Sequence, residues 1–185
     1  HSQGAGPRLI GELGRAARTD PAVRGVPARC LPLDVWHTAS VGIDLWLSAI
    51  SFGASQVLVL MTDEEAPDYR RAVAAQMAVA QAILSGRGFR GKHSHLIDAA
   101  DARALDAALN IAPADTVAQG ASFAVPADKR NALDFAIDHL RAQSPLAAAS
   151  APLPEAIALP AGGSPLGSLL VDPDKSTMCL GSVGG

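Results

Sequence analysis

The chain has 185 residues, of which 49% are hydrophobic, with 18 acidic and 15 basic side chains. This length and apolar fraction support one ordinary domain with a buried core, and they exclude a disordered or collagen-like chain. The formal net charge of -3 provides no basic field for a phosphate backbone, so we do not expect nucleic acid as the main partner.

The first predicted element is a helix from Pro7 to about Arg18. Proline is tolerated in a first helical turn, and the residue before Pro21 resists the helical conformation. Residues 28–33 then alternate enough in character to predict a strand.

The next part of the chain predicts the centre of the fold. Residues 41–52 carry apolar side chains around most of a short helix, which a glycine follows. The run 56–61 is apolar and β-branched, which is typical of a strand that is covered on both faces. Thr62 and Glu65 have the spacing of a capping box, which predicts a helix over 66–85.

The second half of the chain predicts fewer regular elements. In chain order they are a short strand at 94–97, a helix that Asp98 or Asp101 caps and that ends near Leu109, an amphipathic helix from Asp128, and a last short strand at 167–171. Strands separated by helices indicate a three-layer α/β domain with a mainly parallel sheet of about four strands. We therefore divide the chain into an α/β domain (1–143), a Pro/Ala/Gly-rich linker or surface connection (144–166) and the beginning of a second module (167–185).

Polar residues follow the predicted strand ends at one edge of the sheet. His1, Asp34, His37, Asp63 and Glu64 meet there if the strands are parallel. They could hold a divalent metal or act as acid and base. The favoured interpretation is structural, because helix N-termini attract carboxylates through the helix dipole and the free amides.

Three weaker signals involve glycine, histidine and tryptophan. The Gly-x-Gly turn at 4–6 is a poor dinucleotide fingerprint, since leucine replaces the third glycine, and pyrophosphate binding is not expected. His93 and His95 would lie on one side of a strand as a partial metal site, but this segment supplies no third ligand. Trp36 and Trp46 could anchor a partner, although burial in the core is the default for tryptophan beside an apolar helix.

Cysteine content and hydropathy bear on the cellular environment. The chain contains only Cys30 and Cys179, which provide neither a disulfide framework nor a closed zinc site. Its apolar runs are too short to cross a bilayer, so we expect a cytoplasmic protein without membrane insertion. We also expect the chain to be a piece of a longer protein, since it starts without methionine and ends inside the motif described next.

The C-terminal residues 171–185 carry a metal-binding pattern. Their sequence, VDPDKSTMCLGSVGG, resembles the opening of a bacterial ferredoxin loop, C-x-x-C-x-x-C-x-x-x-C-P, in which three thiolates surround one 4Fe-4S cluster. Cys179 takes the second ligand position, while Ser176 and Ser182 take the first and third. Serine is a poor substitute for thiolate, so no cofactor is expected in this chain alone, and Cys179 is a cluster ligand only in the full-length protein. The alternative is a serine- and glycine-rich flexible tail.

The body of the chain also carries a family resemblance. Residues 31–37 (LPLDVWH), 41–44 (VGID), 52–57 (FGASQV) and 64–70 (EEAPDYR) look like the central region of proteobacterial iron-sulfur cluster-binding proteins of the 4Fe-4S ferredoxin type. More distantly, the body is similar to the delta-subunit domain of methyl-viologen-reducing hydrogenase. The 2Fe-2S site of that subunit does not carry over, because Cys30 falls within a predicted strand.

The resemblance implies a non-catalytic electron-transfer module. Such a module spaces or docks adjacent ferredoxin domains, or contacts a redox partner protein. Two alternatives remain open: a small-molecule or nucleotide-binding regulatory domain that uses the strand-end crevice, and a hydrolase that uses His37 with Asp34 or Asp63. The hydrolase ranks last because no nucleophile can be identified.

Overall fold

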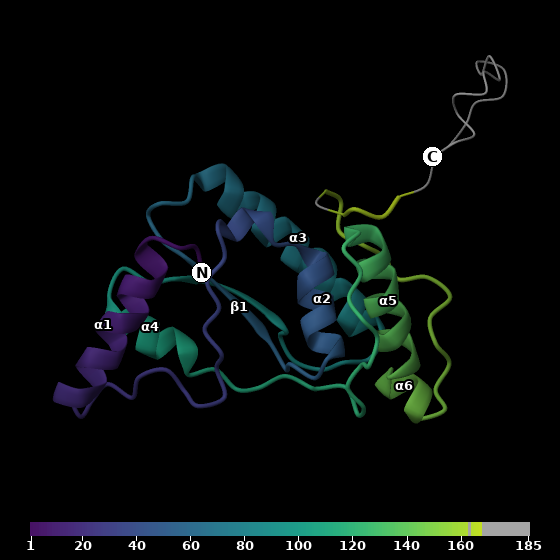
Figure 1. Ribbon diagram of the computed structural model, residues 1–185. Coiled ribbons are helices and arrows are strands. Elements are labelled where there is room, and N and C mark those ends of the chain that lie inside the picture. Colours follow the sequence, from purple (N-terminus) through teal and green to yellow (C-terminus); the bar gives the residue numbers. More distant parts are fainter. Residues whose placement is uncertain (163, 168–185) are drawn as a thin grey trace, which may run out of the picture.

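The computed structural model describes residues 1–162 and 164–167 (Figure 1). Its elements are α1 (Ala5–Thr19), the 3-10 turn η1 (Thr38–Ser40), α2 (Ile43–Ser51), β1 (Val57–Met61), α3 (Pro67–Gly86), β2 (Ser94–Asp98), α4 (Ala102–Leu109), α5 (Lys129–Ala142) and α6 (Pro145–Ala148). Strands β1 and β2 pair in parallel, with Val57 opposite Ser94 and Met61 opposite Asp98. The α/β class predicted from the sequence is therefore confirmed.

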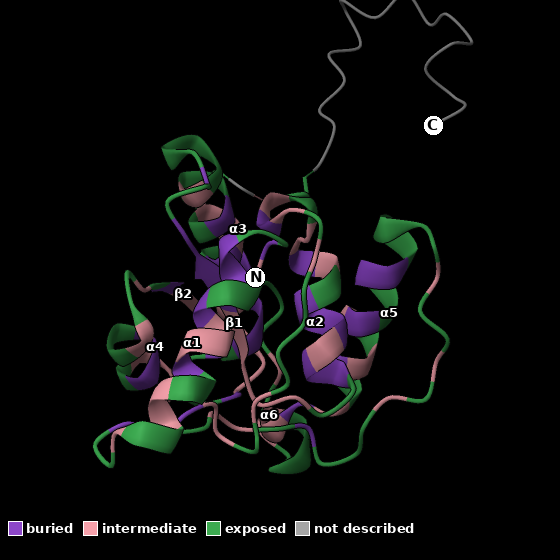
Figure 2. Cartoon of the chain, turned by 60° about the vertical axis from the view of Figure 1, so that its left-hand side comes forward, coloured by how far each residue is buried: buried purple, intermediate pink, exposed green. Residues whose placement is uncertain are grey.

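Strand β1 is covered on both faces, as its composition predicts. Val59 and Met61 enter a larger hydrophobic cluster with α2, α3 and α5, whereas Leu60 enters a smaller one with α1 and α4. Figure 2 shows buried residues gathered around β1, where these helices meet the strand. Because successive side chains along β1 point to opposite faces of the sheet, the strand contributes to two cores, one packed against helices on each face.

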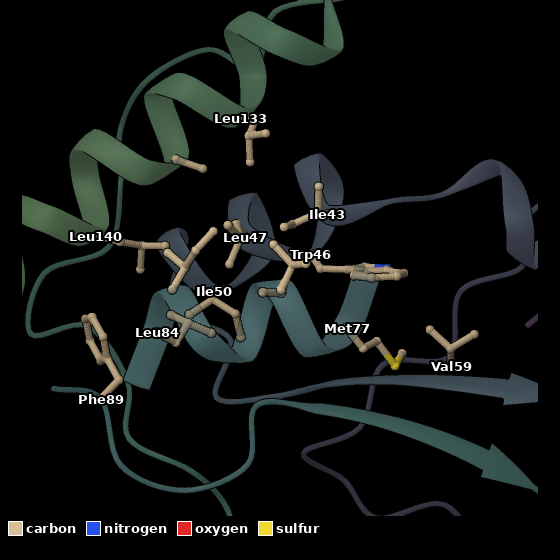
Figure 3. Close-up of a cluster of buried hydrophobic side chains, with 14 of the residues drawn as sticks. Ile43, Trp46, Leu47, Ile50, Val59, Met77, Leu84, Phe89, Leu133 and Leu140 are labelled. Carbon is tan, nitrogen blue, oxygen red and sulfur yellow. The ribbon is translucent and has the colours of Figure 1, made fainter. Parts of the chain in front are cut away.

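The larger cluster is built around α2. Trp46 is 1% exposed and Leu47 is fully buried. Figure 3 shows the side chains that surround them, which are Ile43 and Ile50 of α2, Val59 of β1, Met77 and Leu84 of α3, Leu133 and Leu140 of α5, and Phe89. This dense packing makes α2 the central helix of the domain.

The sheet has two strands in the described part of the chain, and the prediction of about four strands is wrong. Residues 28–33 form no strand, because the Cys30 amide donates to the Pro27 carbonyl in a turn (2.8 Å) and Pro32 has no amide to donate. Only an isolated parallel bridge follows, between Val35 and Ser2. The last predicted strand, at 167–171, lies outside the described residues except for Gly167, which is not in a strand.

Helix boundaries agree closely with their sequence signals. The Asp101 carboxylate accepts the Ala104 amide (2.8 Å) at the start of α4, and Asp128 accepts the Asn131 amide (2.9 Å) at the start of α5. Helix α3 begins at a proline, which suits a first helical position. None of the helices in the described ranges is long and apolar enough to span a membrane.

The segment after α5 follows the surface of the domain. Ser144 donates to the Arg87 carbonyl (2.5 Å) just beyond α3. Further along, Ile157 lies so close to Gly86 that a β-carbon there would meet it at 2.8 Å, and Leu159 packs on the larger cluster. Residues 144–159 are therefore held against the domain by these contacts.

Candidate functional site at the strand carboxyl ends

The carboxyl ends of β1 and β2 border a shallow depression of about 720 Å³. Its lining comes from α1, α3 and the residues that follow the strands, and includes Arg8, Glu12, Asp63 and Arg70. Arg70 donates to the Thr62 carbonyl (3.0 Å) after β1 and forms an ion pair with Asp98 at the end of β2. This arginine ties the two strand ends together, a role that its position within α3 did not reveal.

Glu65 is the most heavily bonded side chain at this edge. It is 5% exposed, and its carboxylate accepts hydrogen bonds from the Ser2 hydroxyl (2.6 Å), the Thr38 hydroxyl (3.2 Å), the Thr62 amide (2.7 Å) and the Thr62 hydroxyl (2.9 Å). The predicted contact between Glu65 and the Thr62 amide is therefore present, but α3 begins only at Pro67, so this contact closes the turn before the helix.

These hydrogen bonds also set the charge of Glu65. Burial alone would raise the pKa of the carboxyl, but the bonds from Ser2, Thr62 and Thr38 favour the charged form and leave the pKa below its ordinary value. Glu65 is thus an ionised carboxylate at neutral pH. It joins three separate segments: the residues before α1, η1 and the turn after β1.

The Glu64 carboxylate lies against the first turn of α1. Its carboxylate accepts the Ala5 amide (2.9 Å) in the first turn of that helix. A β-carbon at Gly4 would overlap the same carboxylate, so a larger residue there would have to push the end of the Glu64 side chain aside. An internal carboxylate therefore takes the position that a phosphate would need at this Gly-x-Gly turn.

The other predicted crevice residues make separate local contacts. The His37 ring accepts the Ala39 amide at Nδ1 (3.1 Å) and packs edge-on against Tyr69, and His1 Nδ1 lies 3.1 Å from the Ser2 carbonyl. Among the described residues, Asp34 accepts one long bond, from Gln3 (3.5 Å), and Asp63 is exposed at the depression. Within residues 1–162 and 164–167, no three His, Cys, Asp or Glu side chains are grouped to hold a metal.

His93, directly before β2, and His95, within β2, make bonds to the backbone instead. His93 is fully buried, with Nε2 3.1 Å from the Asp115 carbonyl, and His95 Nε2 lies 3.0 Å from the Lys92 carbonyl. Burial lowers the pKa of both rings, and hydrogen bonds to backbone carbonyls only partly offset it. The Nε2 atoms of both rings are thus held by structural contacts, whereas Nδ1 of His93 is buried without a hydrogen-bond partner among the described residues.

The two tryptophans have opposite environments. Trp46 is 1% exposed in the larger cluster, whereas Trp36 is 84% exposed. Leu31 and Leu33, on the same irregular segment as Trp36, are 81% and 68% exposed. The segment 31–36 therefore presents an apolar surface, which sequence reasoning could not distinguish from a buried strand.

Comparison with known proteins adds no relative. No protein-family model, no curated protein and no solved structure matched the chain.

The contact between Gly4 and Glu64 makes a direct prediction. Gly4→Ala should destabilise the domain by about 1 kcal/mol, because the added methyl displaces the Glu64 carboxylate from the Ala5 amide. In a Glu64→Ala background, the same substitution should cost less, since the obstacle is gone. Urea denaturation of the four chains in this double-mutant cycle measures the difference. An equal loss of unfolding free energy from Gly4→Ala in both backgrounds would contradict the contact between Gly4 and Glu64.

Proposed function

We propose that the chain is a non-catalytic, cytoplasmic α/β module of a multi-cluster iron-sulfur electron-transfer protein, which spaces or docks 4Fe-4S ferredoxin domains. The resemblance over 31–37, 52–57 and 64–70, and the ferredoxin register of Cys179, support this proposal. The observation that carries it furthest is the filled strand edge. Glu64 and Glu65, within the resembling segment, bind the protein's own amides and hydroxyls at the edge where α/β proteins usually bind ligands.

An exposed surface suits the docking part of the proposal. Trp36 stands free of the core on a segment that crosses the surface, where an aromatic side chain can supply contact area to a partner protein. Such a partner would be an adjacent ferredoxin domain or a separate redox protein.

The cluster itself does not fit the residues of this chain. A 4Fe-4S cluster needs thiolates, and the loop pattern offers Cys179 with serine at positions 176 and 182. These loop residues lie outside the described part of the structure. The proposal therefore assigns cluster binding to the full-length protein, and Ser176 and Ser182 are not competent ligands as they stand.

Restoring the loop tests this assignment. Ser176→Cys and Ser182→Cys, with Cys-Pro and the following coding residues added after Gly185, should give broad visible absorption after anaerobic incubation with iron and sulfide. The matched control carries Cys179→Ser in addition and should take up much less cluster. A colourless product from the restored loop would contradict the ferredoxin interpretation.

A small-molecule or nucleotide-binding regulatory domain is the second candidate. The depression beside Arg8 and Arg70 is the feature that favours it. Two observations oppose it: Arg70 is already paired with Asp98, and Glu64 occupies the start of α1. A thermal-shift screen with nucleotides and divalent metals separates the two functions, since a ligand of the native state raises the melting temperature.

A further inference from the structure

One edge of β1 has no backbone partner in the described part of the chain. The Val57 amide donates to the His93 carbonyl (2.8 Å), and Val57 is in register with Ser94. In a parallel ladder, residues 57, 59 and 61 therefore face β2, while Leu58 and Leu60 direct their amides and carbonyls to the other side. The backbone amides and carbonyls of Leu58 and Leu60 make no hydrogen bond among the described residues.

This edge is buried at Leu60, whereas Leu58 is partly exposed. Leu60 is 6% exposed, and its side chain packs in the smaller cluster. Buried backbone groups are nearly always paired, since leaving one unpaired costs about 1–3 kcal/mol. The buried edge therefore indicates the place of a further strand.

The segment 29–35 borders the same place and runs in the same direction as β1. At the beginning of β1, the Arg29 side chain donates to the Ile111 carbonyl (3.1 Å), while Gln56 donates to the neighbouring Ala112 carbonyl (2.9 Å). At the other end, Thr38 bonds to Glu65 (3.2 Å). Figure 1 shows this segment rising toward the N-terminus of the chain.

Residues 1 and 2 lie between these two borders. The His1 amino nitrogen donates to the Leu33 carbonyl (3.2 Å), and the Val35 amide donates to the His1 carbonyl (2.9 Å), which is the alternation of a parallel ladder. On the other side, Ser2 donates to Glu65 (2.6 Å), just beyond β1. The ladder therefore places the beginning of the given chain at one end of this gap, paired with residues 33–35.

We propose that the residues directly preceding His1 in the longer protein form a strand that inserts in parallel between β1 and the segment 29–35. It pairs with the free amides and carbonyls of Leu58 and Leu60 on one side, and with residues near Leu31 and Leu33 on the other. Because both faces at β1 are covered by helices, the strand is an apolar, β-branched run of about five residues. The ladder and the buried edge carry this inference independently of the iron-sulfur function.

Hydrogen exchange tests the insertion. The chain extended by about eight residues encoded before His1 is compared with residues 1–185 and with an extended control that has proline at alternate positions of the extension. Exchange at Leu58 and Leu60, measured relative to the β2-bonded amide of Val59, should slow by about tenfold or more in the extended chain and stay fast in the proline control.

Two results would overturn the proposal. One is unchanged relative exchange at Leu58 and Leu60 after the extension. The other is strong protection of these two amides already in residues 1–185, which would show that the edge has no missing partner. Neither outcome depends on iron or sulfide, so the proposed strand and the proposed cluster function fail separately.

Discussion

Glu65→Ala should lower the free energy of unfolding by about 3 kcal/mol. The substitution leaves the Ser2 and Thr38 hydroxyls and the Thr62 amide without their acceptor in a buried place. Each unsatisfied buried group costs about 1–3 kcal/mol. Urea denaturation at neutral pH measures the loss, and Asp63→Asn, an exposed change two positions earlier, should stay within about 0.5 kcal/mol of the parent. A loss from Glu65→Ala no larger than that of the control would contradict the role assigned to this carboxylate.

The same carboxylate makes stability depend on pH. The pKa of Glu65 is lower in the folded protein than its ordinary value of about 4.3, so the unfolded chain binds the proton more readily. The stability that Glu65 contributes is complete above that ordinary value and is lost as the pH falls through the folded pKa. The difference between the parent and Glu65→Gln should therefore shrink on acidification, and a constant difference would contradict the lowered pKa.

Trp46→Ala should cost about 3–5 kcal/mol, whereas Trp36→Ala should leave stability within about 0.5 kcal/mol. The reason is burial: Trp46 lies within the cluster between α2, α3 and β1, and Trp36 is 84% exposed. Thermal and urea unfolding of both variants measure the contrast. If docking uses the exposed side chain, Trp36→Ala should weaken binding to a ferredoxin domain with an unchanged fold. A large stability loss in Trp36→Ala would contradict its assigned exposure.

Local patterns predicted α1 to α5 and β1 because their signals lie within a few residues, whereas α6 falls in the segment predicted as a linker. The apolar run of β1 and the capping aspartates of α4 and α5 act through neighbours in the sequence. Residues 28–33 have apolar alternation, but Pro27 precedes the segment and Pro32 lies within it. The turn at Cys30 therefore forms in place of the predicted strand.

The candidate site was predictable only in part because its bonds join distant segments. The sequence placed Glu64 at a strand end, but not its contact with the Ala5 amide, 59 positions away. Glu65 was assigned to a local capping box, whereas three of its four bonds come from hydroxyl groups, two of them on the segments around Ser2 and Thr38. These contacts depend on how the chain folds back on itself, so the spacing of neighbouring residues does not predict them.

The coding sequence that flanks residues 1–185 tests the central claim most directly. If the chain is a module of a multi-cluster iron-sulfur protein, the codons after Gly185 specify Cys-Pro, and ferredoxin-type cysteine loops are encoded on both sides of the α/β domain. Flanks without cysteine clusters on either side would contradict the account.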